Sequence, residues 1–72
     1  MSDARALVAD AIDRPIDQVP VTGTIETVPG WDSLGHMRII LALEARLGRP
    51  LDANDILGLT SISAIQDVLG GS

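Results

Sequence analysis

The chain has 72 residues with no cysteine, one histidine and a net charge of −5, from ten acidic residues and five arginines. This length is close to the lower limit at which a hydrophobic core alone stabilises a domain. The absence of cysteine excludes disulfides and thiolate metal sites, and a single histidine argues against a zinc site. An acidic chain repels nucleic-acid phosphates overall. We therefore expect no bound metal and no nucleic-acid partner.

No apolar run approaches the length of a membrane span, and residues 1–5 lack the basic start and apolar run of a secretion signal. We expect a cytoplasmic protein without a membrane partner. The charge is unevenly distributed: residues 1–32 carry a net −4, residues 33–51 a net +2 and residues 52–72 a net −3. The segment that starts at Ser33 is thus the least acidic part of the chain.

The first predicted element is a helix over residues 4–12. Its apolar residues follow the spacing of one helix face: Ala4, Leu7, Val8, Ala11 and Ile12. Ser2 or Asp3 can cap this helix, and Pro15 limits its extension.

Residues 13–30 contain three prolines and no helical period. Aliphatic residues recur along the segment: Ile16, Val19, Val21, Ile25 and Val28. A long loop with such residues is typical of an ordered segment pinned across the core, and strand pairing is the weaker alternative.

The second helix is predicted over residues 33–47, with Asp32 as its N-cap and Gly48 and Pro50 at its end. Asp52 caps a short helix that runs through Ile56 or Leu57 and ends at Gly58.

The last predicted helix begins after Thr60 or Ser61, and its apolar positions are Ile62, Ile65, Val68 and Leu69. These elements predict an all-α fold: a small antiparallel bundle of three main helices plus one short helix. We expect one monomeric domain over residues 1–69 and a flexible tail over residues 70–72. Because the chain has no Phe or Tyr, its core must be largely aliphatic.

Ser33 is the main candidate for chemistry, since it stands where the second helix begins, directly after the Pro29-Gly30 turn. Unpaired backbone N–H groups and the helix dipole make such a position favourable for a phosphate-linked group. The alternative is that Ser33 is an ordinary residue of the first turn that shares capping with Asp32. No Gly-x-Ser-x-Gly elbow is present, and His36 is predicted to face solvent, so a hydrolase is not supported.

The second helix has two apolar stripes when its residues are placed 100° apart. One stripe contains Leu34, Met37, Leu41 and Ala45, and the other contains Ile39, Ile40, Leu43 and Leu47. Such a helix is either buried on both sides, with the loop covering one stripe, or offers one stripe to partners.

Two neighbours of Ser33 are predicted to have packing roles. Trp31 precedes the cap and is expected to pack as a staple onto the first helical turn, near His36 or Met37. Gly35 is costly in a helix, which indicates either close approach of another backbone or cofactor, or plain tolerance.

The segment Gly30-Trp31-Asp32-Ser33-Leu34-Gly35-His36-Met37, followed by Leu41-Ala42-Leu43-Glu44, resembles the acyl carrier proteins. The order of the predicted helices agrees with that family over nearly the whole chain. The resemblance implies a non-catalytic carrier on which Ser33 receives 4′-phosphopantetheine from coenzyme A. Because the arm ends in a thiol, a chain without cysteine would hold acyl groups as thioesters.

The resemblance also implies roles for the residues around Ser33. Asp32 would cap the second helix and assist metal and transferase recognition, while Leu34, Met37, Arg38 and Leu41 would face partners. The implied core is Ile40, Leu43 and Leu47 with Leu7, Ile12, Ile56, Leu59, Ile62 and Ile65. The implied partners are a phosphopantetheinyl transferase, a loading ligase or acyltransferase, and ketosynthase, condensing or other acyl-processing enzymes.

The chain departs from fatty acid carriers just after the serine, where Gly35, His36 and Arg38 replace the usual acids and only Glu44 remains acidic. This departure favours a stand-alone carrier of a polyketide, lipopeptide or other specialised pathway. A peptidyl or aminoacyl carrier ranks second, because the tryptophan variant differs from the Gly-Gly-x-Ser-Leu form. The third alternative is a helical interaction module that uses Leu34, Met37 and Leu41 while Ser33 only caps.

Overall fold

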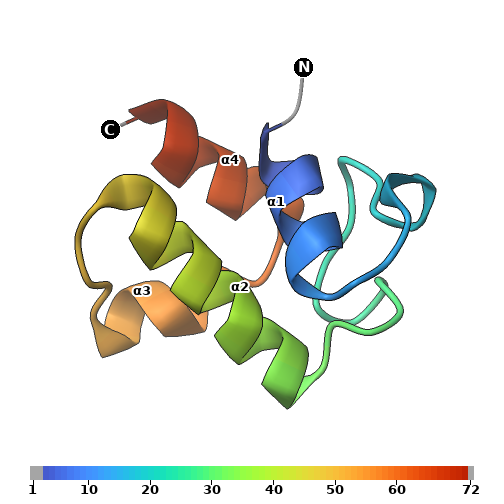
Figure 1. Cartoon of the computed structure of the whole chain (residues 1–72), viewed down its shortest axis with the longest axis horizontal. Helices are drawn as coiled ribbons and strands as arrows, with labels where there is room; N and C mark the ends of the chain where they lie inside the picture. Colours follow the sequence, from blue (N-terminus) through green and yellow to red (C-terminus); the bar gives the residue numbers. More distant parts are fainter. Residues whose placement is uncertain (1–2, 72) are drawn as a thin grey trace.

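A computed structural model describes residues 3–71, which are predominantly helical (Figure 1). The elements in chain order are α1 (Asp3–Ala11), the 3-10 turn η1 (Ile16–Gln18), α2 (Ser33–Leu47), α3 (Ala53–Gly58) and α4 (Ile62–Gly71). The predicted all-α class, with three main helices and a short one, is confirmed. α1 packs against both α2 and α4, so the three main helices enclose one core.

The helix boundaries follow from local capping chemistry. Three predicted N-caps each accept a hydrogen bond from the backbone three residues on: Asp32 from Gly35 (2.8 Å), Asp52 from Asp55 (2.8 Å) and Ser61 from Ala64 (3.1 Å). Ser61 rather than Thr60 therefore caps α4, while Ser2, the other proposed cap of α1, lies outside the described residues. The left-handed Gly48 (φ 72°) ends α2 as predicted.

The end of α4 differs from the prediction. The helix continues through Gly70 and Gly71, two residues beyond Leu69, where the sequence analysis placed the start of a tail. Glycine is a poor helix former, but the four backbone N–H groups of a last turn bond back to carbonyls already in place. Ser72 lies outside the described residues.

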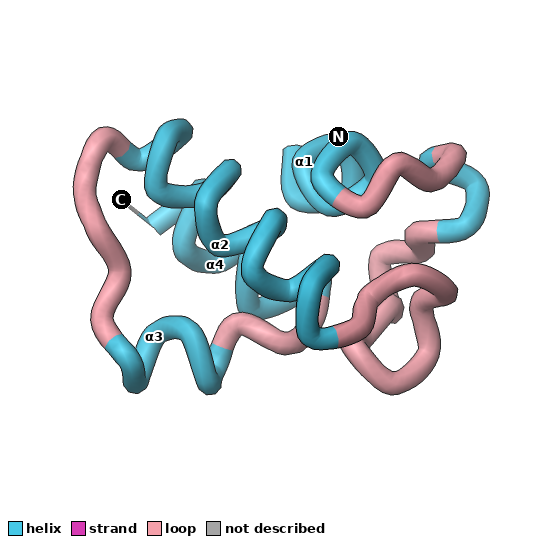
Figure 2. The backbone as a smooth tube through the Cα atoms, turned by 60° about the horizontal axis from the view of Figure 1, so that its bottom comes forward, coloured by secondary structure: helices cyan, strands magenta, loops and turns pink. Residues whose placement is uncertain are grey.

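The segment between α1 and α2 is a long ordered loop that crosses one end of the bundle (Figure 2). Val19 and Val28 are buried and Ile25 is half-buried, whereas Ile16 and Val21 are exposed. The weaker strand alternative reduces to one isolated bridge between Thr24 and Ser61. Two backbone hydrogen bonds flank that bridge: Ile25 N–H to Thr60 O (2.9 Å) and Ile62 N–H to Gly23 O (3.0 Å). They pin the loop to the connection that precedes α4.

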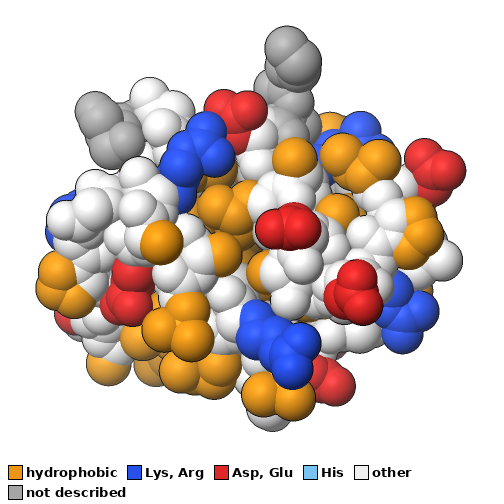
Figure 3. Space-filling view, viewed as in Figure 1, with side chains coloured by type: hydrophobic (Ala, Val, Ile, Leu, Met, Phe, Trp, Pro, Cys, Tyr) orange, Lys and Arg blue, Asp and Glu red, His pale blue; other side chains and the backbone are white. Residues whose placement is uncertain are grey.

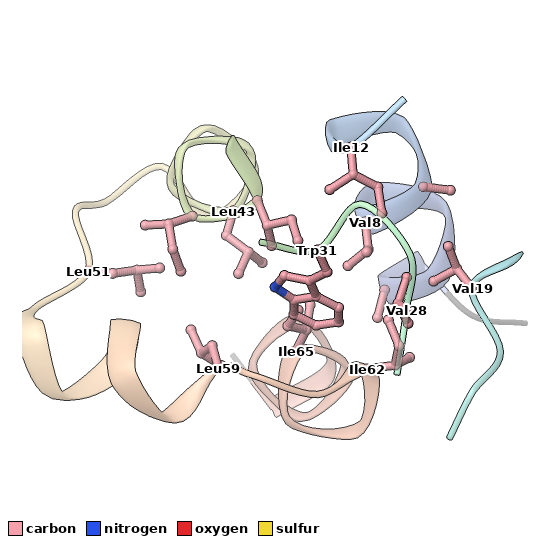
Figure 4. Close-up of a cluster of buried hydrophobic side chains, with 14 residues drawn as sticks. Val8, Ile12, Val19, Val28, Trp31, Leu43, Leu51, Leu59, Ile62 and Ile65 are labelled. Carbon is pink, nitrogen blue, oxygen red and sulfur yellow. The ribbon is translucent and has the colours of Figure 1, made fainter. Parts of the chain in front are cut away.

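The core lies between α1, α2 and α4, with Trp31 near its centre (Figure 4). Its largest fully buried side chains are Ile39, Ile40, Leu43, Ile62, Ile65, Val8 and Val19. Of the core residues implied by the resemblance, Leu7, Leu47 and Ile56 are half-buried and the other six are buried. The core is aliphatic apart from Trp31, which is only 3% exposed.

Candidate functional site

Ser33 is the first residue of α2, at the end of the long loop (Figure 2), and its side chain is exposed. The capping role predicted for Asp32 is confirmed, because its Oδ1 accepts the hydrogen bond from the Gly35 N–H. Within residues 3–71 the Ser33 hydroxyl has no hydrogen-bond partner. Since Asp32 supplies the cap, the hydroxyl is left available for chemistry.

The surroundings of Ser33 fit a phosphate-linked group. Ser33 and Leu34 occupy the first two helical positions, whose backbone N–H groups have no intrahelical acceptor. A phosphodiester on the Ser33 oxygen would lie at the positive end of a 15-residue helix. The exposed Arg38, on the next turn of α2, lines a small hollow of about 160 Å³ together with Gly35 and the carboxylate-bearing Asp32. The free N–H groups, the helix dipole and Arg38 favour an anion beside the accessible hydroxyl, while Asp32 is the one acidic group that lines the hollow.

Gly35 allows another backbone to approach closely, which was one of the two explanations that the sequence analysis offered for a glycine in this helix. A Cβ at this position would overlap the carbonyl oxygen of Gly30 and lie 3.1 Å from the side chain of Ile12. The missing side chain lets the Pro29-Gly30 turn lie directly on the first turn of α2. This packing fixes the position of Ser33 relative to the end of the loop.

Substitution of Gly35 by alanine is expected to destabilise the protein by about 1–3 kcal/mol, because overpacking against backbone outweighs the gain of roughly 1 kcal/mol in helix propensity. Chemical denaturation followed by circular dichroism measures the change. Gly58→Ala in α3 is the matched control, since a Cβ there meets nothing within 4 Å and should leave stability equal or higher. Equal stability of Gly35→Ala and wild type would contradict the proposed packing.

The prediction that His36 faces solvent was wrong. Its ring is half-buried, and its Nδ1 lies 3.1 Å from the Trp31 indole nitrogen while its Nε2 lies 2.8 Å from the Ile56 carbonyl oxygen. Because the indole N–H can only donate, Nδ1 accepts, and the ring proton on Nε2 is donated to Ile56. The two rings are stacked with centroids 6.3 Å apart. The staple predicted for Trp31 therefore exists, and His36 extends it from α2 to α3.

The stripe of Leu34, Met37, Leu41 and Ala45 is exposed, which decides between the two predicted arrangements of α2. Leu34 is 63%, Met37 49% and Leu41 61% exposed, whereas Ile39, Ile40 and Leu43 are buried. The loop therefore leaves this stripe uncovered, and apolar side chains lie along α2 beside a basic one (Figure 3). Leu57 of α3, which the sequence analysis did not single out, is 76% exposed. The sequence did contain a signal for this exposure: Ile56 and Leu57 are adjacent apolar residues in a six-residue helix, so they cannot both face the core.

Glu44, the only acid of α2, has a structural contact. Its carboxylate is half-buried and accepts a hydrogen bond from the Leu51 N–H at 2.9 Å. It therefore holds the loop between α2 and α3. The exposed charged groups of α2 are the guanidinium groups of Arg38 and Arg46.

Within residues 3–71, no cluster of three histidine, aspartate or glutamate side chains is arranged to hold a metal ion. In the same part of the chain, no helix has both the length and the hydropathy to cross a membrane.

A helical domain with an accessible serine at the start of its longest helix is the architecture of a carrier protein. The sequence model of the phosphopantetheine attachment site family matches residues 2–69, and the chain belongs to this family. The comparison with curated proteins gave no match. The match covers nearly the whole chain and bears out the resemblance to acyl carrier proteins. The protein's cofactor is thus a covalently attached 4′-phosphopantetheine, and its role is that of a phosphopantetheine carrier.

Proposed function

We propose that Ser33 is the attachment site of 4′-phosphopantetheine and that the protein holds acyl intermediates as thioesters for a specialised pathway, such as polyketide or lipopeptide synthesis. The observation that carries the proposal is the exposed Ser33 hydroxyl, which is not needed as a helix cap because Asp32 accepts the hydrogen bond from the Gly35 N–H. The bound arm supplies a terminal thiol, which this chain lacks. The chain's own contribution is to position the attachment oxygen at a rigid helix start and to catalyse no step itself.

The attachment reaction would use groups around Ser33. The Ser33 oxygen attacks the phosphorus next to the pantetheine of coenzyme A, its proton passes to a base of the transferase, and adenosine 3′,5′-diphosphate leaves. In this proposal the exposed Asp32 carboxylate assists recognition of the metal and the transferase, while its Oδ1 keeps the α2 cap. Incubation with coenzyme A, Mg²⁺ and a broad-specificity transferase should add the mass of one phosphopantetheine. A folded chain that gains no mass would refute the proposal.

The exposed stripe is proposed as the docking face for partner enzymes. Leu34, Met37 and Leu41 lie on α2 within three turns of Ser33, and Arg38 adds a positive charge at the same end. Any enzyme that reaches the Ser33 oxygen must approach this end of α2. Because the exposed Arg38 stands in the stretch where fatty acid carriers have acids, a partner that presents carboxylates to Arg38 fits better than one with a basic patch.

The substitution Met37→Arg is expected to slow phosphopantetheine transfer by about tenfold or more, which corresponds to about 1.4 kcal/mol, while the domain stays folded. The physical reason is that an exposed apolar contact becomes a charge that the transferase must desolvate. The kcat/KM of loading, followed by mass spectrometry, measures the effect. Ser63→Arg, an exposed position on α4, is the control that should load like wild type. Unchanged loading of Met37→Arg would show that the transferase does not dock on the stripe.

The choice of acyl over aminoacyl cargo rests on the tryptophan-containing motif, which differs from the form typical of peptidyl carriers. Intact mass spectrometry of the protein purified from its own cells reads the thioester-bound group directly. An amino acid on the arm would select the aminoacyl alternative.

A further inference from the structure

An open groove runs between α1 and α2, on a different side of α2 from the exposed stripe. Its main hollow of about 560 Å³ is lined by Asp3, Ala6, Leu7, Asp10, Ala42 and Arg46, which we call the α1–α2 groove. Figure 3 shows hydrophobic atoms on its floor and charged side chains of both signs around it. Nothing in the attachment or docking proposals uses this groove.

The groove leads from Ser33 along the crevice between the two helices. The α2 residues that face α1 are spaced by three or four: Gly35, Arg38, Ala42 and Arg46. Because the helices are antiparallel, Gly35 lies against Ile12 just after α1, while Arg46 reaches Asp3 at its start. The small hollow beside Ser33 and the α1–α2 groove therefore follow each other along one crevice.

We propose that the α1–α2 groove is the resting site of the protein's own phosphopantetheine arm, an inference that rests on Ser33 being the attachment site. Ala42 lies nine residues after Ser33, which is about 13 Å along a helix at 1.5 Å per residue. The arm has roughly fourteen consecutive bonds from the serine oxygen to the sulfur, which span about 16 Å at the advance per bond of an extended polypeptide. The arm is thus long enough to bring its thiol end to Ala42.

The lining of the groove matches the chemistry of the arm. The arm carries two amides, a hydroxyl and a pair of methyl groups, so it needs acceptors, donors and an apolar floor. Asp10 offers an exposed carboxylate to the amide N–H groups, and Arg46 offers N–H donors to the amide carbonyls. The small side chains of Ala6 and Ala42 leave room above Leu7 for the methyl groups and the methylene chain.

The charged rim can open for the arm at little cost. Arg46 and Asp3 form an ion pair at 3.4 Å whose side chains are 54% and 62% exposed. An exposed pair of this kind contributes little to stability, so its groups can turn to the amides. The thiol end then lies away from Leu34, Met37 and Leu41, and a partner bound to that stripe must draw the arm out.

A nitroxide attached to the arm tests this placement. Because the chain has no cysteine, the arm's thiol is the single thiol of the loaded protein and takes a maleimide nitroxide specifically. Intact mass spectrometry first confirms loading and labelling. In ¹H–¹⁵N spectra we expect the amide signals of Leu7, Asp10 and Ala42 to lose most of their intensity, and to lose clearly more than those of Leu57 and its neighbours in α3. Reduction of the nitroxide should restore the lost signals.

A pair of alanine substitutions supplies the matched control. Ala42→Leu fills the groove floor and should return most of the lost intensity at Leu7, whereas Ala53→Leu, at an exposed position of α3, should leave the broadening as in wild type. Broadening concentrated over α3, or spread evenly over the protein, would overturn the placement while leaving Ser33 as the attachment site. A chain that gains no arm would overturn the proposed function and this inference with it.

Discussion

Replacement of Ser33 by alanine is expected to abolish phosphopantetheine attachment completely while leaving the free energy of unfolding within about 0.5 kcal/mol of wild type. The side chain is exposed, and its hydroxyl has no partner within residues 3–71, so its loss costs the fold nothing. Alanine is also the best helix former. Mass spectrometry after incubation with coenzyme A and a transferase, together with urea denaturation, measures both quantities on one preparation.

The comparison with Asp32→Ala separates attachment from capping. That change removes the acceptor for the Gly35 N–H and should cost about 1 kcal/mol of stability, as loss of an N-cap does. Ser63→Ala, an exposed serine of α4, is the control that should load and fold like wild type. If Ser33→Ala is instead clearly less stable than wild type and still accepts the arm, Ser33 is a structural residue and the arm is attached elsewhere.

The parts of the fold that could be predicted from the sequence are those fixed by local chemistry. Asp32, Asp52 and Ser61 each cap a helix through an N–H only three residues away, so a short window contains the whole interaction. The spacing along α2 also separated the buried from the exposed stripe, although it did not say whether the loop covers the second one. Burial of that stripe depends on tertiary packing, which periodicity alone does not contain.

The contacts that the sequence did not disclose join residues far apart in the chain. The Ile56 carbonyl that accepts the His36 proton is twenty residues away and belongs to the backbone, so no side-chain pattern marks it. The close approach of Gly30 to Gly35 was only one of two alternatives, because a turn's position relative to the following helix depends on the packing of Ile12 as well. Around Ser33, the exposed serine at the start of α2 and its Asp32 cap were therefore predictable, whereas the framework that positions them was not.

That framework has its weakest part in α3. The short helix has no buried residue of its own, and it is held by the Asp52 cap, the buried Leu51 and Leu59 on either side, and the His36 hydrogen bond to Ile56. His36 in turn depends on Trp31, which donates to its Nδ1. The start of α2, the core and α3 are thus coupled through one tryptophan.

We expect Trp31→Ala to lower the free energy of unfolding by about 3–5 kcal/mol, the usual cost of truncating a large buried aromatic side chain. A domain of this size has a total stability of roughly 4–11 kcal/mol, so the variant should lose much of its folded population on mild heating. The indole is 3% exposed and lies between Val8, Leu43 and Ile65 (Figure 4), so its removal leaves a cavity in the core. Thermal denaturation followed by circular dichroism is the measurement, since the variant has no tryptophan fluorescence.

Two milder variants divide the role of Trp31 between packing and hydrogen bonding. Trp31→Phe keeps most of the apolar volume but removes the donor to His36, while His36→Ala leaves the buried indole N–H without its acceptor and should cost about 1–3 kcal/mol. In both variants the backbone amides of α3 should exchange hydrogen faster than in wild type, because the contact with Ile56 is weakened or lost. Unchanged exchange in α3 for His36→Ala would show that the Asp52 cap and the flanking leucines hold α3 without His36, and the coupling from Trp31 would end at α2.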